Sequence, residues 1–292
     1  MAVYSIKELE ILSGIKAHTI RVWEQRYKMF APVRTDTNIR RYSDDDVRRA
    51  LNISMLQNMG YKISHIARMS DEEKGKLVTK GNGFTSPPPV PEGLFELVIN
   101  LDKKGFTKKI NESIKSKGLE WTYENLIIPF QLRVGMLWQA GTLTPAHEHF
   151  ASNIIRDILI NAINGTSQAT LKNPTIIFFL PEGELHEMGL LYYNYIAASK
   201  GFQTLYMGQN TPVEDVIEIA LSKGIKLIFT SFTVNMPDEY IQSIARRMQK
   251  ELKGTTVFVS GHLVEVKKSI LPKGLALISS SQQFKEYLDS NL

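Results

Sequence analysis

Short apolar runs recur along the C-terminal part of the chain and alternate with segments of helical periodicity. Continuous apolar runs of this length are typical of strands that are buried on both faces. Strands that alternate with helices predict an α/β domain with a parallel, doubly wound sheet. The predicted strands cover residues 175–180, 203–207, 226–231, 255–260 and 275–279, and the predicted helices cover 186–200, 212–223, 236–252 and 282–290.

The middle of the chain shows helical periodicity with few breaks, which predicts an all-helical unit. The four helices expected there cover residues 93–103, 106–117, 121–140 and 144–164.

A linker precedes this helical unit. It contains Gly81 and Gly83, which break helices, and Pro87, Pro88 and Pro89, which favour an extended spacer. The residues before the linker form short helical segments around a basic turn. The pattern therefore predicts a head over residues 1–69, a linker over 70–91, a four-helix domain over 92–168 and a sheet domain over 172–292.

Charge is unevenly distributed between these parts. The chain has 35 Lys and Arg against 30 Asp and Glu, and its first 80 residues hold 15 of the former and 10 of the latter. A small basic head on a neutral body is typical of nucleic-acid-binding proteins. An excess of this size is also common by chance, so charge alone indicates DNA only weakly.

The 292 residues include no cysteine, which excludes disulfides, Cys-ligated zinc, iron–sulfur clusters and thiolate catalysis. A metal site would depend on His, Asp or Glu. No apolar run approaches the roughly 20 residues of a membrane span, and Met1–Leu12 has no signal-peptide core. We expect a cytoplasmic protein without membrane contact.

The head has the pattern of a helix-turn-helix. Ser5 and Glu8 can form a capping box at the start of the first helix, and Gly14 can end that helix. A second helix is expected at about 17–27. In such motifs the early residues of the second helix reach base edges in the major groove. The residues expected there are Lys16, His18, Thr19 and Arg21.

A basic turn follows the second helix. Arg34, Arg40, Arg41 and Tyr42 lie on this turn, where they can contact phosphates at the groove edge. Ser43 then caps a further helix.

Residues 4–69 resemble the winged-helix DNA-binding domain of the MerR family. The resemblance rests on Tyr4–Leu9, Thr19–Glu24, Arg40–Ser43 and Leu56–Tyr61. It implies a winged helix-turn-helix head that binds double-stranded DNA; the alternative is an ordinary helical bundle with solvated Arg side chains. The family's long C-terminal dimerising helix and its metal-binding cysteines are missing, so sensing and assembly would depend on the rest of the chain.

A histidine lies on the loop after the first predicted strand, at the sheet edge where ligands bind in such folds. Gly183 and Gly189 flank His186, and Glu184 can hydrogen-bond one ring nitrogen and fix the tautomer, as metal-bound histidines usually require. The alternative is a surface or capping histidine, which is the more common role of a single loop histidine.

Two further loops end at the same sheet edge, with Ser231 and Thr233 on one and Ser260 and Gly261 on the other. Together with the His186 loop they resemble the cobalamin-binding, Rossmann-like domain. The resemblance implies that His186 replaces the cofactor's own benzimidazole base as the lower cobalt ligand, with the displaced nucleotide tail beside these loops. Ser260 departs from the family, which has glycine there.

Within the helical unit, Trp138 is followed by Glu148 and His149 at the spacing found in the helical cap of cobalamin-binding proteins. The resemblance implies that these residues cover the upper face of the corrin; taken singly they would be a core aromatic and a solvated helix start. In light-sensing members a histidine follows the Trp, whereas this chain has Gln139, a poorer cobalt ligand. His147 and His149 are candidates to replace it.

The whole chain thus resembles the CarH and LitR-type cobalamin-dependent photoreceptor regulators. The resemblance implies a transcriptional repressor that is not an enzyme, holds adenosylcobalamin, and binds its operator as a homo-oligomer, a tetramer built as a dimer of dimers. Two alternatives remain: a corrinoid methyl carrier of a methyltransferase system, against which the DNA-binding head argues, and a regulator that responds to cobalamin without light or has lost it.

Overall fold

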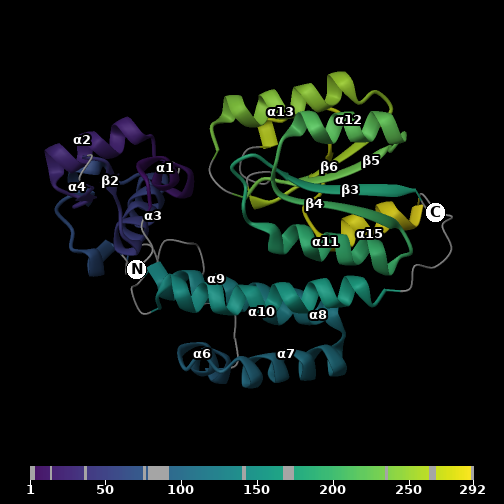
Figure 1. Ribbon diagram of the computed structural model, residues 1–292, viewed down its shortest axis with the longest axis horizontal. Coiled ribbons are helices and arrows are strands. Elements are labelled where there is room, and N and C mark those ends of the chain that lie inside the picture. Colours follow the sequence, from purple (N-terminus) through teal and green to yellow (C-terminus); the bar gives the residue numbers. More distant parts are fainter. Residues whose placement is uncertain are drawn as a thin grey trace. The chain divides into compact units, whose positions relative to one another are not determined.

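The computed structural model divides into two compact units, 1–155 and 156–292, and the boundary falls inside helix α10 (Pro145–Asn164). Figure 1 shows the helices and strands of both. The structure describes residues 4–13, 15–35, 38–74, 77, 92–139, 143–166, 174–233, 236–262 and 268–290.

The head is a small helical domain with a two-stranded wing, as predicted. Strand β1 (Val33–Arg34) pairs antiparallel with β2 (Arg40–Arg41), and Tyr4 and Tyr42 exchange backbone hydrogen bonds of 2.8 Å beside it. Gly14 and the side chain of Glu8 lie outside the described residues. The capping box of Ser5 and Glu8 and the end of the first helix at Gly14 therefore stay predictions. The helices are α1 (Ile6–Ser13), α2 (Ala17–Tyr27), α3 (Asp44–Asn58) and α4 (Ile63–Ile66).

Within the predicted linker, residues 71–74 are helical. Ser70 and Glu73 form a reciprocal capping box, with Glu73 N donating to Ser70 Oγ and Ser70 N donating to Glu73 Oε2. Asp71 also binds Arg49 of α3, with 2.9 Å between Arg49 Nη2 and Asp71 Oδ2. These contacts hold the first turn after the head against it. The prolines predicted to extend the linker lie outside the described residues.

The helical region contains the expected helices with two changes. The first helix ends earlier than predicted, because Leu101 takes a left-handed backbone conformation. Asp102 then caps the next helix by accepting a hydrogen bond from Gly105 N at 2.9 Å. The third contains a π-helical turn immediately before Pro129, which has no N–H to donate and so interrupts the α-helical ladder. The elements are α6 (Glu92–Ile99), α7 (Lys103–Lys117), α8 (Leu119–Thr122), the π-helix η1 (Tyr123–Ile127) and α9 (Ile128–Gln139), followed by α10.

The second unit confirms the predicted doubly wound sheet. All five strands are parallel in the order β4-β3-β5-β6-β7. Helices α12 and α13 cover one face and α11 and α15 cover the other (Figure 1). The strands are β3 (Thr175–Pro181), β4 (Gln203–Thr211), β5 (Leu227–Ser231), β6 (Thr256–Ser260) and β7 (Ala276–Leu277); the helices are α11 (Glu187–Ser199), α12 (Val213–Lys223), α13 (Asp238–Glu251) and α15 (Ser281–Ser290), with a 3-10 turn at Lys268–Ile270.

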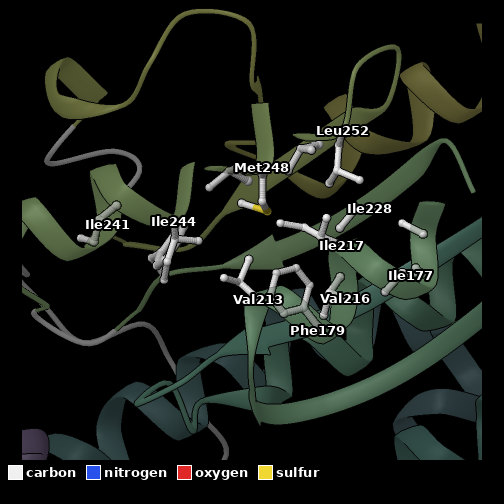
Figure 2. Close-up of a cluster of buried hydrophobic side chains, with 14 of the residues drawn as sticks. Ile177, Phe179, Val213, Val216, Ile217, Ile228, Ile241, Ile244, Met248 and Leu252 are labelled. Atoms are coloured by element: carbon white, nitrogen blue, oxygen red, sulfur yellow. The ribbon is translucent and has the colours of Figure 1, made fainter. Parts of the chain in front are cut away.

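Both faces of this sheet are apolar, which explains the unbroken apolar runs. Ile177, Phe179 and Ile228 pack against α12 and α13, together with Met248, in the core that Figure 2 shows. The intervening positions belong to an aromatic layer on the other face, in which Phe229 stacks on its neighbour Phe178 at 5.4 Å between ring centroids. Side chains of a strand alternate between faces, so a strand with two covered faces is apolar at most of its positions.

Strand β4 is longer than predicted and carries an irregularity that bends it toward the loop after β3. The register between β3 and β4 shifts after Phe178, opposite Tyr206 and Gly208. In the sheet, β4 lies on one side of β3 and β5 lies on the other. The chain runs from β3 to β4 and then crosses back past β3 to β5, so the direction of winding reverses at β3. Ligands bind at such a reversal, beyond the carboxyl ends of the strands. None of the described helices is both long and apolar enough to cross a membrane.

Candidate cofactor and DNA-binding sites

The loop after β3 holds His186 at the sheet's reversal point. Gly183 has φ of +86°, a conformation that favours glycine, and its N–H donates to Asn210 Oδ1 at 2.9 Å. Asn210 N in turn donates to the Glu184 carbonyl at 3.3 Å. The bent end of β4 therefore shapes this loop. His186 is the residue immediately before α11, and its side chain is 56% exposed.

Glu184 lies beneath the histidine and has no solvent exposure. Its Oε1 lies 2.8 Å from His186 Nδ1 and accepts from His186 N at 2.9 Å. Its Oε2 accepts from Thr233 N, on the loop after β5, at 2.6 Å. A buried carboxylate needs such hydrogen-bonding partners. The three contacts hold one carboxylate between two loops of the sheet edge.

This arrangement selects one tautomer of His186. A carboxylate oxygen can only accept, so Nδ1 of His186 is the donor and carries the ring proton. The Nε2 atom then keeps its lone pair, on a ring that is more than half exposed. Histidines that ligate metals are held in this way by a second group on the other ring nitrogen.

The other predicted residues at this edge lie at or just after the ends of β5 and β6 and on the first turn of α11. Ser231 and Ser260 are paired in the sheet register and are nearly buried, and Gly189 lies on the first turn of α11. Gly261 has φ of +102°, and a Cβ atom there would lie 2.3 Å from the Phe232 carbonyl oxygen. The loops after β5 and β6 therefore approach each other so closely that only glycine fits.

The three predicted cap residues lie on α9 and α10. Trp138 is half-buried and packs against the hydrophobic core of the head; its indole Nε1 is buried and has no acceptor among the described residues. Glu148 accepts a short hydrogen bond from Ser152 Oγ, and Nε2 of His149 lies 3.5 Å from Glu148 Oε2. His149 is the most exposed of these groups, with 64% of its side chain accessible.

His147, one candidate to replace the missing histidine after Trp138, is engaged within its own helix start. The Nδ1 atom of His147 accepts from Thr144 N at 3.2 Å and lies 2.7 Å from Thr144 Oγ1. Because an amide N–H can only donate, the ring proton of His147 is on Nε2, which leaves neither nitrogen with a free lone pair. This tautomer is opposite to that of His186. The side chain of Gln139 lies outside the described residues.

The start of α2 presents the expected polar surface. His18 and Arg21 are exposed, Thr19 is half-buried, and Lys16, just before the helix, bonds Glu10 Oε1 at 3.1 Å. Ile20 and Trp23 point into the head core. The apolar positions thus hold the helix, while its opposite side is open to solvent, the arrangement that a recognition helix requires.

The wing arginines are anchored by α2. Arg40 Nε lies 2.9 Å from Glu24 Oε2, and Arg34 Nη2 lies 3.7 Å from Glu24 Oε1. The hydrogen bond from Arg40 to Glu24 raises the pKa of Arg40. Arg41 is half-buried and Arg34 is exposed. Glu24, which sequence reasoning did not single out as a wing contact, therefore holds the wing against the helix.

Tyr42 requires a correction. It was predicted to contact phosphate, but the residue has no solvent exposure, and its hydroxyl lies in the head core without a hydrogen-bond partner among the described residues. Burial raises the pKa of Tyr42 to about 12. A side chain enclosed in this way cannot reach a phosphate without the head opening, so Tyr42 is a core residue.

Sequence reasoning also missed a cluster next to His186. Glu187 follows it in the chain, and the carboxylate of Glu187 binds Arg156 of α10 and Tyr206 of β4, at 2.6 Å from Arg156 Nε and 2.7 Å from the Tyr206 hydroxyl. A Glu at the first turn of a helix is a common sequence signal that predicts no partner. The two contacts depend on the tertiary fold.

Two protein families match the N-terminal and middle parts of the chain. The family described as MerR HTH family regulatory protein matches residues 4–73, and the B12 binding domain family matches residues 90–161. The chain therefore combines a MerR HTH domain with a B12-binding domain, which confirms the resemblance seen in the sequence.

Named relatives agree with this class. The chain is homologous to the HTH-type transcriptional repressor CarH of Myxococcus xanthus, with 25% identity over 266 residues that cover 88% of both chains. The HTH-type transcriptional repressor CarA of the same organism is 23% identical over 238 residues, 80% of this chain and 78% of CarA. Both relatives are named as transcriptional repressors.

One solved structure shows the same fold outside the regulators. The monomethylamine corrinoid protein of Methanosarcina barkeri superposes with a TM-score of 0.55 and 18% identity, and the match covers 68% of this chain and 96% of that protein. At this identity the likeness concerns the fold, the Rossmann-like fold of B12-binding proteins.

Proposed function

We propose that this protein is a DNA-binding repressor that holds adenosylcobalamin, with His186 as the protein ligand of its cobalt. The arrangement of His186 and Glu184 carries the proposal. An imidazole with its Nδ1 proton on a buried carboxylate offers Nε2 to a metal. A corrinoid brings its own equatorial nitrogens and needs only one such ligand from the protein.

The remaining residues are assigned to the group by the resemblance to cobalamin-binding proteins. Trp138 belongs to the proposed cap, and in this structure its indole Nε1 is buried against the head core. The narrow approach of the loops at Gly261, with Ser231, Thr233 and Ser260 beside it, offers small side chains and backbone groups to a nucleotide tail. Gly189, Glu148 and His149 complete the proposed set. When bound, adenosylcobalamin supplies a cobalt–carbon bond that light breaks.

The head supplies DNA binding through two surfaces. We assign base contacts to Lys16, His18, Thr19 and Arg21 at the start of α2. Phosphate contacts are assigned to Arg34, Arg40 and Arg41 of the wing. Single heads of this size bind weakly, and linking several multiplies their effective concentration at an operator. A homo-oligomer, such as a dimer of dimers, that forms only with cofactor would therefore switch operator occupancy.

The cofactor proposal is tested by reconstitution in the dark with adenosylcobalamin, desalting and absorbance. A corrin spectrum that stays with the protein supports it, and a colourless protein overturns it. The ligand is identified with ¹⁵N-labelled protein and cob(II)alamin. A labelled histidine nitrogen splits the electron paramagnetic resonance lines into doublets, whereas the cofactor's own ¹⁴N base gives triplets. The doublet is expected in the parent protein and in His262→Ala, which removes an exposed histidine at the same sheet edge, but not in His186→Ala.

Light is tested separately by size exclusion of the loaded protein in the dark and after illumination. An elution volume that shifts with light supports photoreception. A volume that responds to adenosylcobalamin but not to light indicates the second candidate function, a light-independent cobalamin sensor. The engagement of His147 with Thr144 favours this second function, because it removes one imidazole that could bind cobalt after illumination.

A further inference from the structure

Two carboxylates flank His186, and they are held by different parts of the second unit. Glu184 binds the histidine ring and the loop after β5, as described above. Glu187, on the other side, is the first residue of α11, and its side chain is only 9% exposed. The backbone of Glu187 donates to the Leu185 carbonyl at 3.0 Å, which closes the turn that contains His186. A shift of the Glu187 backbone would therefore move the backbone of His186.

The charge on Glu187 is matched by its surroundings. A carboxylate so nearly buried is stable only with charged or hydrogen-bonding partners. Arg156 Nε provides the positive charge at 2.6 Å and Tyr206 donates its hydroxyl proton at 2.7 Å. The hydrogen bond to Glu187 raises the pKa of Arg156, and burial, together with the bond to Glu187, raises the pKa of Tyr206. Both partners thus keep their protons over the whole physiological range.

The three partners come from three elements. Arg156 lies on α10, Tyr206 lies on β4 where its register with β3 shifts, and Glu187 begins α11. Without Arg156, the Glu187 carboxylate would keep only the phenol among its described partners and would be more stable when turned toward water. Where the start of α11 shifts to allow this, the turn that Glu187 N closes shifts with it and displaces the imidazole from the position set by Glu184.

We propose that Arg156, acting through Glu187 and Tyr206, is a positioning residue that holds the His186 turn in its metal-binding orientation. The inference rests on the proposed function, because it concerns how readily His186 binds cobalt. Arg156 does not itself touch the cofactor in this proposal.

The test uses the full chain labelled with ¹⁵N and loaded with cob(II)alamin. The doublet fraction in the resonance spectrum measures how much cobalt carries the protein histidine. Arg156→Gln is expected to lower this fraction and to weaken binding by about tenfold, the lower end of the effect of groups that orient a metal ligand. Tyr206→Phe is expected to act in the same direction. Arg156→Lys, which keeps the positive charge, should restore most of the doublet.

The matched control is Arg247→Gln. Arg247 pairs with Glu214 and Glu251, and its side chain has the same 40% exposure as that of Arg156. Both variants lose an arginine ion pair and can lose some stability with it. The control is nevertheless expected to keep the parent's doublet fraction. If Arg156→Gln retains the parent's doublet fraction and affinity, the positioning role is wrong while His186 remains the ligand. If the parent protein itself shows no doublet, the proposed function fails first.

Discussion

The Nδ1 atom of His186 lies 2.8 Å from Oε1 of Glu184, a carboxylate with no solvent exposure. The two residues are near neighbours in the chain, but their geometry is fixed from elsewhere. Thr233, 49 residues from Glu184 in the sequence, donates its N–H to the second carboxylate oxygen. The pair is therefore a product of the sheet edge as much as of the loop that contains it.

Glu184→Gln is expected to weaken cobalamin binding. The amide can accept from His186 through only one atom, and its NH₂ group then faces the Thr233 N–H, so one hydrogen bond is lost. Removing a group that orients a metal-binding histidine typically costs about 10- to 100-fold in affinity. Equilibrium dialysis of the variant measures this loss. Glu182→Gln, an exposed carboxyl on the same loop, is the control, and equal affinity of both variants would contradict the role of Glu184.

Gly261→Ala is expected to destabilise the second unit. The new Cβ atom would lie 2.3 Å from the Phe232 carbonyl oxygen at φ of +102°, so strain and a backbone clash add together. We expect a loss of at least about 2 kcal/mol in the free energy of unfolding, measured by urea denaturation. Gly224→Ala is the control, because Gly224 also has positive φ, at +65°, but has open space around it. A smaller loss for Gly261→Ala than for the control would show that the loops can separate.

Arg40→Ala is expected to weaken DNA binding equally across sequences. The wing arginine contacts phosphate in our proposal, so its loss should lower the slope of log affinity against log salt by about 1. The measurement is a binding titration at several salt concentrations. Arg246→Ala removes the same charge from an exposed position of the second unit and should leave the slope unchanged. An unchanged slope for Arg40→Ala would mean that Glu24 retains this arginine when DNA binds.

The contacts of Asp71 predict that the stability of the head depends on pH. Burial alone would raise the pKa of Asp71, but hydrogen bonds from Arg49 and Lys74 lower it below the ordinary value of 3.8. A group with a lowered pKa stabilises the folded state above its unfolded pKa, and this stabilisation is lost as the pH falls through the folded pKa. The contribution is therefore complete at pH 5 and above and disappears in stronger acid.

Asp71→Asn should remove this part of the acid dependence and lower stability at neutral pH. Urea unfolding followed by the fluorescence of the buried Trp23, with Trp121 and Trp138 replaced by Phe, measures it. Glu72→Gln, the exposed neighbour, should keep the parent's profile. An acid profile of Asp71→Asn that matches the parent would show that the ion pairs with Arg49 and Lys74 contribute nothing to the head.

Local sequence patterns predicted the strands of the sheet, the loop with His186 and the exposed start of α2. The five apolar runs became the five parallel strands, because a strand covered on both faces is apolar at most of its positions. The loop after the first strand placed His186 at the ligand-binding edge, and the helix-turn-helix pattern placed the polar start of α2 outward. These features depend on residues close together in the chain.

Partners distant in the chain were decided by the tertiary structure. Tyr42 lies beside two arginines in a basic turn, yet the bridge to Tyr4 turns it into the core. Arg40 meets Glu24 across 16 residues, and Arg156 meets Glu187 across 31. Local residue patterns predicted which segments are helices and strands and where the histidine loop lies. Packing decided which charged side chains form ion pairs. The partner of a charged side chain depends on how whole helices and strands pack together, and the hydrophobic periodicity of its own segment does not reveal it.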